Sequence, residues 1–150
     1  MESIQKTTVG RREFVSFPDL GSDLLEAKID TGAYTTALHC NEIQVLDLGA
    51  EKILSFNIRE PHDKDYAKGR VATSTFTEKI IKNSFGEKEK RFVIKARIKI
   101  GRKIIKTSIS LTDRTGMRYP VLIGRKLLRK RFVVDVQELH LMKTKLAKSV

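Results

Sequence analysis

Alternation of apolar and polar residues along the chain predicts β-strands. The clearest case is Phe92–Ile100, in which every second residue is apolar and cations occupy the other face. Period-2 alternation of this kind is typical of a strand with one buried face. Residues 101–102 supply a turn, and Ile105–Leu111 repeats the alternation with Ser108 and Ser110 facing outward. The two segments therefore predict a β-hairpin.

Shorter segments of the chain predict further strands, a loop and one short helix. The polar segment Arg59–Gly69 predicts a surface loop, and Arg125–Arg131 predicts two helical turns with Leu127 and Leu128 facing inward. No long amphipathic helix is visible, so the predicted fold is mostly β with one short helix near the C-terminus. Further strands are predicted at Glu26–Ile29, Ile53–Ile58, Val71–Ile81, Pro120–Ile123 and Phe132–Val136.

Length and composition suit one globular domain. The chain has 150 residues, of which 40% are hydrophobic, enough for a core. We expect an N-terminal extension at 1–8, a domain at 9–136 and a partly frayed tail at 137–150. No apolar run approaches the roughly 20 residues of a membrane helix, and no secretory signal is visible near Met1. The single cysteine excludes an internal disulfide and, with these features, favours a cytoplasmic protein.

The net charge of +12 is distributed unevenly. From Glu13 to Asp65 there are 11 acidic and 4 basic residues, whereas Lys79 to Lys106 has 11 basic and 2 acidic residues. Such a concentration of positive charge attracts anionic partners, for example nucleic acid, an anionic membrane surface or an acidic peptide. A solvated outer face of a sheet is the alternative interpretation.

One predicted strand ends in a motif with catalytic potential. Residues 27–29 lead directly into Asp30-Thr31-Gly32-Ala33, so a strand delivers an aspartate into a tight turn. The hydroxyl of Thr31 can lock such a turn, and Gly32 lets the backbone approach Asp30 closely. Because Asp, Thr and Gly are ordinary turn residues, the triplet alone is also compatible with a plain β-turn.

A second motif lies nearer the C-terminus. Residues 121–124 form an apolar strand ended by Gly124, and Arg125-Lys126-Leu127-Leu128 starts the short helix. Together with the D-T-G-A turn and the order of the strands between them, this motif resembles the retropepsin-like aspartic proteases. The resemblance implies an all-β fold, a closed β-barrel of the acid protease type with one short C-terminal helix, which works as a two-fold dimer.

Four separated motifs make the resemblance narrower. Together they look like one bacterial family of retropepsin-like proteins, whose members have been labelled ATP-dependent zinc proteases, and they cover about residues 9–136. The motifs are Val9–Glu13, Ala27–Ala33 with Ala37–His39, Lys82–Gly86, and Leu111–Arg114 through Tyr119–Arg125.

The residues give no support to the older label of that family. The chain has no G-x-x-x-x-G-K-[ST] loop for ATP phosphates and no H-E-x-x-H for zinc. His39, Cys40 and His62 are the soft ligands that lie near one another in sequence. Adjacent His39 and Cys40 would point to opposite faces of a strand, so we expect structural roles for both, and no metal or other cofactor.

Aspartic proteolysis needs two carboxylates that share one proton. The chain has one D-T-G motif, so the resemblance implies a dyad made of Asp30 from each of two chains in a homodimer. In this arrangement Asp30, Thr31 and Gly32 are the catalytic residues, with Thr31 bracing the paired loops and Gly32 leaving room for substrate. Ala33 would contact the substrate.

Two further segments are expected near the substrate. Ser84, Phe85 and Gly86 would form the tip of a flap that closes over the cleft, with an ordinary hairpin turn as the alternative. Asp113 and Arg114 fall where this fold has a substrate-facing loop, although they are equally suited to a structural ion pair.

Two departures from viral members of this class raise questions that only a structure answers. Tyr34-Thr35 stands where many viral members have acidic residues, so Arg125 needs another partner. The stretch between D-T-G-A and the flap is also roughly 30 residues longer. It includes the loop around Pro61, which is suited to narrowing the cleft, covering it or binding a partner.

The expected substrate is a peptide or protein. The resemblance brings an association with ATP-grasp glutamate ligases that add glutamates to a ribosomal protein, and a basic enzyme suits an acidic, glutamate-rich peptide. One alternative is a non-catalytic basic β-barrel that binds RNA or the ribosome, although the chain has no Trp for base stacking. Another is a protease fold that binds peptides without cleaving them.

Overall fold

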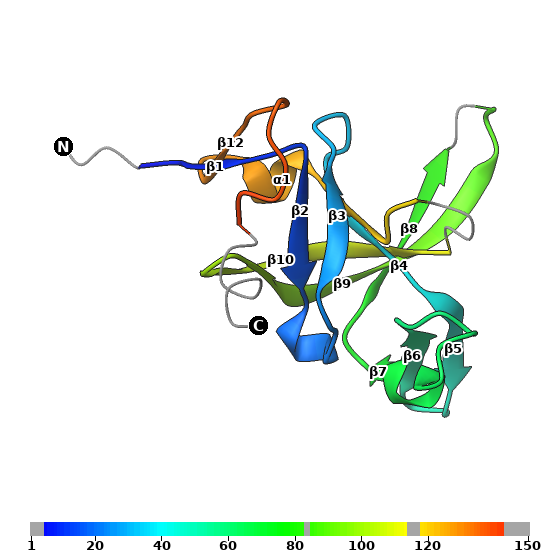
Figure 1. Ribbon diagram of the computed structural model, residues 1–150. Coiled ribbons are helices and arrows are strands. Elements are labelled where there is room, and N and C mark those ends of the chain that lie inside the picture. The colour runs from blue at the N-terminus through cyan, green and yellow to red at the C-terminus, as the bar shows by residue number, and fades with distance from the viewer. Residues whose placement is uncertain (1–4, 83–84, 114–117, 143–150) are drawn as a thin grey trace.

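A computed structural model describes residues 5–82, 85–113 and 118–142. Within this part of the chain the structure is built from short β-strands, with one α-helical turn and two 3₁₀ segments (Figure 1). No described helix is long and apolar enough to cross a membrane. The strands are β1 (Thr7–Val9), β2 (Arg12–Ser16), β3 (Leu25–Ile29), β4 (Thr36–His39), β5 (Asn41–Asp47), β6 (Lys52–Asn57), β7 (Arg70–Thr73), β8 (Thr77–Lys82), β9 (Lys88–Ile100), β10 (Lys103–Thr112), β11 (Val121–Ile123) and β12 (Phe132–Val134); the helix is α1 (Arg125–Leu128), and the 3₁₀ segments are η1 (Pro18–Leu20) and η2 (Tyr66–Gly69).

The main sheet has the strand order β10-β4-β11-β3-β2-β9-β8, and an additional pairing of β10 with β9 closes the first six of these strands into a ring, to which β8 is added at β9. Closure is possible because β9 is long: β10 pairs with it from Phe92 to Ile100, while β8 and β2 pair with it at its two ends, at Lys88–Val93 and at Lys99–Ile100. The fully buried side chains Phe17, Leu38, Ile98, Ile109 and Ile123 belong to the core. The predicted all-β, retropepsin-like fold with one short helix is confirmed.

The β9–β10 hairpin follows the predicted alternation. Ile94, Ala96, Ile98 and Ile100 are buried, and the cations between them are exposed. The expectation that Ser110 faces outward is wrong, because its exposure is 5%. At this end of β10 the helix α1 lies against the strand, and its Lys126 donates a hydrogen bond to Ser108, so the face that carries Ser108 and Ser110 is covered.

Two predicted elements have different bounds in the structure. Val71–Ile81 is not one strand: β7 ends at Thr73 and joins a separate sheet with β6, whereas β8 starts at Thr77 and joins β9. The predicted two helical turns at Arg125–Arg131 shorten to one, because the backbone leaves helical geometry at Arg129, whose ψ is 134°, and Lys130 then takes a positive φ of 67°.

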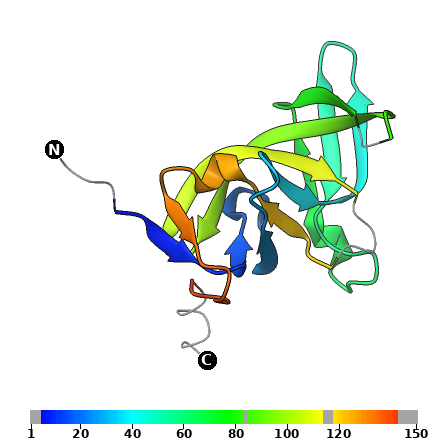
Figure 2. The same cartoon turned by 90° about the horizontal axis from the view of Figure 1, so that it is seen from above.

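The long stretch between the D-T-G-A motif and the flap forms a second, three-stranded sheet of β5, β6 and β7. This inserted sheet stands to one side of the main ring in both views (Figure 2). Asn57 holds the loop that follows β6, because its side chain accepts a hydrogen bond from the Arg59 amide (2.8 Å) and donates one to the Tyr66 carbonyl (2.8 Å). The insertion is therefore an ordered part of the structure that lies beside the ring.

The C-terminal tail, which we expected at 137–150 and partly frayed, lies within the described residues up to 142, and these residues are held against the start of β2. Glu13 is fully buried, and its carboxylate accepts hydrogen bonds from the backbone amides of Gly10 (2.7 Å), Leu141 (3.0 Å) and Met142 (2.9 Å). Gly10 packs so closely that an added Cβ would lie 2.4 Å from the carbonyl oxygen of Glu138. One buried carboxylate thus ties the C-terminal segment to the start of the sheet.

Candidate active site

Asp30 follows β3 at the point where this strand runs parallel to β11. Its amide donates to the Ile123 carbonyl (2.9 Å), which fixes the start of the turn. The Gly32 amide donates to Oδ1 of Asp30 (3.0 Å), and the Ala33 amide donates to the Asp30 carbonyl (3.2 Å). This Asx-type turn is closed by local hydrogen bonds. Asp30 is half-buried, and Thr31 and Gly32 are exposed.

The D-T-G-A motif and the motif around Gly124 meet directly in space. Gly124 packs against this turn so tightly that a Cβ would lie 2.5 Å from the Tyr34 carbonyl oxygen. The amide of Arg125 donates to the Ala33 carbonyl (2.8 Å), and the amide of Lys126 donates to the Tyr34 carbonyl (2.9 Å). The start of α1 therefore anchors the far side of the loop that carries Asp30.

Arg125 has a partner in place of the acidic residue that is missing after the D-T-G-A motif. Its Nη1 donates to the Thr31 carbonyl (2.9 Å), and its guanidinium lies 5.7 Å from the centre of the Tyr34 ring. Both contacts are to the turn itself. Tyr34, which departs from the viral pattern, supplies the aromatic surface for this cation.

The other predicted site residues are only partly within the described chain. Phe85 is 87% exposed, and Gly86 has a φ of 82°, which suits a turn at the end of the β8–β9 hairpin. This hairpin end and the loop between β3 and β4 lie at the same, upper side of Figure 1. Asp113 is exposed. Ser84 and Arg114 lie outside the described residues, so the flap and the substrate-facing loop stay predictions.

A basic hollow of about 600 Å³ lies beside β3. Arg12 is held at its wall, since Nη1 donates to the Tyr119 hydroxyl (2.9 Å) and lies 3.8 Å from the Glu26 carboxylate. Lys28, two residues before Asp30, is exposed. The hollow thus combines four cations with one carboxylate; its lining residues are Arg11, Arg12, Glu26, Lys28, Ile29, Arg118 and Tyr119.

This hollow was not found from the sequence, which placed the positive charge at 79–106. Its cations come from separate places, namely the residue before β2 together with the first residue of β2, the exposed face of β3, and the residue before Tyr119. The signal that was available is the Val9–Glu13 motif, which contains Arg11 and Arg12. Strand pairing of β2 with β3 then places Arg12 opposite Lys28.

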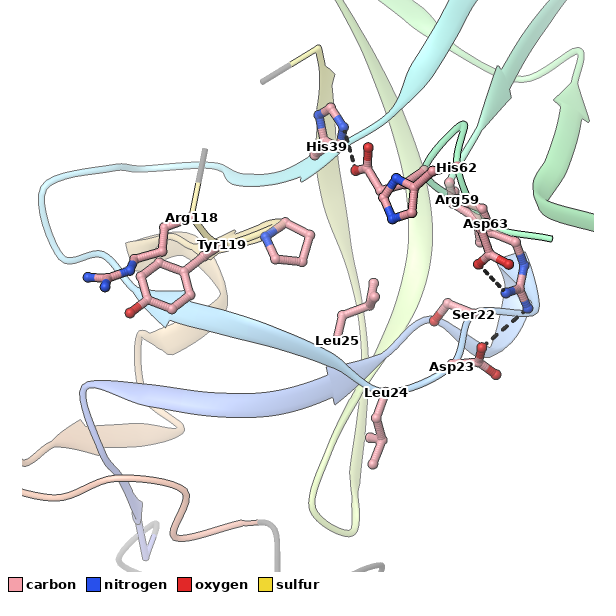
Figure 3. A pocket seen from close by; sticks show the side chains of 13 residues that line it. Ser22, Asp23, Leu24, Leu25, His39, Arg59, His62, Asp63, Arg118 and Tyr119 are labelled. Atoms are coloured by element: carbon pink, nitrogen blue, oxygen red, sulfur yellow. Dashed lines mark hydrogen bonds and ion pairs between the residues drawn. The ribbon is translucent and has the colours of Figure 1, made fainter. Parts of the chain in front are cut away.

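A second hollow of about 620 Å³ adjoins the first, because Arg118 and Tyr119 line both (Figure 3). The loop that follows β6 supplies one of its walls, through lining residues between Ile58 and Asp63. Arg59 bridges that wall to the main ring, with Nη1 3.0 Å from Asp63 and Nη2 3.2 Å from Asp23. The backbone amide of Asp65 and then Arg59 hold the pKa of Asp63 below its usual value. The insertion therefore adds a second hollow next to the basic hollow beside β3.

His39 and Cys40 are both buried. Nε2 of His39 lies 3.0 Å from the Glu60 carboxylate in the second hollow. Burial, together with the charge of Asp113, raises the pKa of the Cys40 thiol far above its ordinary value, which disfavours the thiolate that binds metals. Among the residues that the structure describes, no three His, Cys, Asp or Glu side chains are grouped as metal ligands.

The ring of strands and the Asp-Thr-Gly turn braced by the glycine before α1 define a retropepsin-like protein. A family model described as "RimB-like: Retropepsin-like aspartic endopeptidase RimB" matches residues 8–145. The chain therefore belongs to the RimB-like family of retropepsin-like proteins.

The chain is also similar to curated relatives with another name and to a solved structure. The chain is 31% identical over 134 residues to a probable alpha-L-glutamate ligase of Desulfotalea psychrophila, and 31% identical over 136 residues to one of Shewanella pealeana. These matches cover 89% and 91% of this chain but 29% and 30% of the relatives, so the chain spans about three tenths of their length. A protein of unknown function from Legionella pneumophila has the same fold, with a TM-score of 0.68, 24% identity, and 92% and 99% of the two chains covered.

Proposed function

We propose that this protein is an aspartic-type endopeptidase whose catalytic pair is Asp30 from each of two chains in a homodimer. The observation that carries the proposal is the Asp30 turn, in which the backbone is fixed from both sides while the carboxylate receives one hydrogen bond from the described residues, that of the Gly32 amide. Its remaining lone pairs are available to a water and to a second carboxylate. A two-fold axis brings identical residues together, which supplies that second carboxylate.

In the proposed reaction the two carboxylates hold one proton between them, because like charges so close cannot both be ionised easily. The ionised group removes a proton from a water, and the water oxygen bonds to the carbonyl carbon of the peptide. The protonated group donates a hydrogen bond to the carbonyl oxygen. When the C–N bond of the tetrahedral intermediate breaks, a proton passes to the departing amine, and a carboxylic acid and an amine remain.

We propose acidic, glutamate-rich peptides as the substrates. The basic hollow lies along β3, the strand that leads to Asp30, and Arg12 is already oriented there by Tyr119 and Glu26. Guanidinium groups bind carboxylates with charge-assisted hydrogen bonds. The relatives that are named glutamate ligases support the same substrate class, since a glutamate-bearing chain is what such a protein makes.

The decisive experiment compares wild type with Asp30→Asn on glutamate-rich and glutamine-rich peptides of equal length, with sedimentation to report the dimer. Asp47→Asn is the matched control, because Asp47 forms the same turn, with the Gly49 amide donating to its Oδ1 at 3.0 Å, in the inserted sheet. We expect cleavage to fall at least about 1,000-fold in Asp30→Asn and to persist in Asp47→Asn. We also expect faster cleavage of the glutamate-rich peptide at low salt.

Several outcomes contradict parts of this proposal. Equal cleavage by wild type and Asp30→Asn would show that Asp30 is not catalytic. Peptide binding without turnover by wild type would indicate a protease fold used for binding. Equal cleavage of both peptides at every salt concentration would be consistent with a peptidase but would contradict the proposal that its substrates are acidic.

A further inference from the structure

A continuous cationic face covers the outside of the β9–β10 hairpin. Register places Lys95 opposite Ser108, Arg97 opposite Lys106, and Lys99 opposite Ile104, so these side chains share one face. Lys126 of α1 joins them, because its Nζ donates to the Ser108 hydroxyl (3.1 Å). We define the cationic face by its five exposed cations, Lys95, Arg97, Lys99, Lys106 and Lys126.

The arrangement of charge on this face is unfavourable for the isolated chain. Arg97 and Lys106 stand directly opposite each other, and like charges in that position destabilise a sheet. One carboxylate moderates the repulsion: Asp19 accepts from Nη2 (2.6 Å), Nε (2.8 Å) and the backbone amide (2.8 Å) of Arg97. Within the described part of the chain, no ion pair is formed by Lys95, Lys99, Lys106 or Lys126. One carboxylate, Asp19, thus stands against five cations, and a cost to stability that the chain compensates only in part points to an external anion.

The composition of the face favours nucleic acid over protein as its partner. Protein interfaces are built around an apolar or aromatic centre that is depleted in lysine. Of the described side chains on this face, Ile104 is the apolar one, at 53% exposure, and none is aromatic. Interfaces with nucleic acid are polar and strongly positive. A face without aromatic side chains cannot stack unpaired bases, which single-strand binding uses.

We propose that the cationic face binds the phosphate backbone of a nucleic-acid duplex without reading its bases. Its five cations line neither of the two hollows near Asp30. The two activities therefore use different residues, and this proposal does not rest on the proposed peptidase function.

Fluorescence anisotropy with a labelled 20-base-pair RNA duplex tests the proposal, using the full chain at 50 to 200 mM NaCl. With the slope of log K against log salt that B-form DNA gives, about −0.9 for each neutralised phosphate, five contacts give about −4.5 and roughly a 500-fold loss of affinity over this range. In Lys95→Gln/Lys99→Gln/Lys106→Gln the slope should weaken by about 2.7. The corresponding triple Lys→Arg variant should bind like wild type, because the charge is kept.

The matched control removes three exposed lysines from the inserted sheet and its loop, as Lys52→Gln/Lys64→Gln/Lys68→Gln. It has the same net charge as the test variant and should keep the wild-type slope. Asp30→Asn should bind the duplex unchanged, which separates failure of this proposal from failure of the peptidase proposal. Thermal unfolding of each variant verifies that it is folded.

Three results would overturn the proposal. Equal loss of affinity in the control and test variants would mean that net charge alone, and no particular face, attracts the duplex. Tighter binding of single-stranded RNA than of duplex would contradict recognition by backbone alone. Displacement of the duplex by poly-glutamate at equal charge concentration, with binding of that polymer lost in the same triple variant, would assign the face to an acidic protein.

Discussion

Two carboxylates at the ends of neighbouring strands have opposite surroundings. Glu13 on β2 is fully buried, and three backbone amides donate to its two oxygens. Asp30 follows β3, is half-buried, and its carboxylate receives one such bond from the described residues, that of the Gly32 amide. β2 and β3 are paired, so both groups belong to the same part of the sheet.

The difference separates a group that holds the fold from a group suited to chemistry. A buried carboxylate is tolerated when its lone pairs are filled by donors, and it then connects whatever carries those donors. Glu13 connects β2 to residues that lie 128 and 129 positions away. Asp30 is placed by its backbone instead, through Ile123 and the start of α1, which leaves carboxylate lone pairs for a water and a partner.

The largest expected effect on stability comes from Glu13→Gln. The change keeps the size of the side chain but puts an amide N–H against a backbone donor in a buried site. We expect a loss of about 2–4 kcal/mol in the free energy of unfolding, measured by urea denaturation. Asp30→Asn should change it by less than about 0.5 kcal/mol. Similar losses in the two variants would remove the distinction between them.

A smaller effect is expected from Arg125→Met, which removes the hydrogen bond to the Thr31 carbonyl and the contact with Tyr34. Stability should fall by less than about 1.5 kcal/mol, since these contacts are exposed. The proposed cleavage rate should fall about 10-fold or more, because small displacements of a reacting group slow catalysis steeply. The control is Arg131→Met, since Nη1 of Arg131 also donates to a backbone carbonyl, that of Leu127 at 3.2 Å. Equal rates in both variants would contradict a positioning role for Arg125.

The smallest effect is expected at Asp63, whose surroundings lie between those of Glu13 and Asp30. Its carboxylate is hydrogen-bonded to the Asp65 amide and to Arg59, but the pair is partly solvated. Because its pKa is lowered in the folded state, its contribution is present above the ordinary value of 3.8 and is lost as the pH falls through the lowered pKa. Asp63→Asn should therefore lower Tm by no more than about 3 °C at pH 7.

That difference should shrink below pH 3.8 and vanish at still lower pH, as measured by thermal unfolding across a pH series. The side-chain amide that Asp63→Asn introduces is uncharged throughout, so the variant's own curve has no such step from this position. A constant difference at every pH would show that Asp63 acts through packing rather than through its charge.

Local features of this fold could be predicted from the residues that form them. The alternation in Phe92–Ile100 identified a half-buried strand, because side chains in a strand point to opposite faces in turn. The Asx turn at Asp30 depends on Gly32 two positions later. The motif at Gly124 identified the strand and helix that brace this turn, since their contact is typical of the fold that the motifs resemble.

Features that join distant segments could not be predicted in the same way. The segment Val71–Ile81 has the composition of one strand, yet its halves pair with different neighbours in different sheets. In the sequence, Glu13 has no sign of being buried. It is buried because residues 141–142, which are far away along the chain, donate hydrogen bonds to its carboxylate. The cations of the basic hollow are scattered along the chain and meet through the pairing of β2 with β3 and the position of Arg118.

The physical reason is the range of the forces that each feature depends on. Strand alternation and turn geometry follow from bonds within a few residues, so the order of residues specifies them directly. Burial of Glu13, the partner of Arg125 and the basic hollow depend on which strands lie side by side, and that is settled when the whole core packs. The local sequence thus determines the strands and the D-T-G turn. The charges around that turn are brought together by packing between segments that are far apart in the chain.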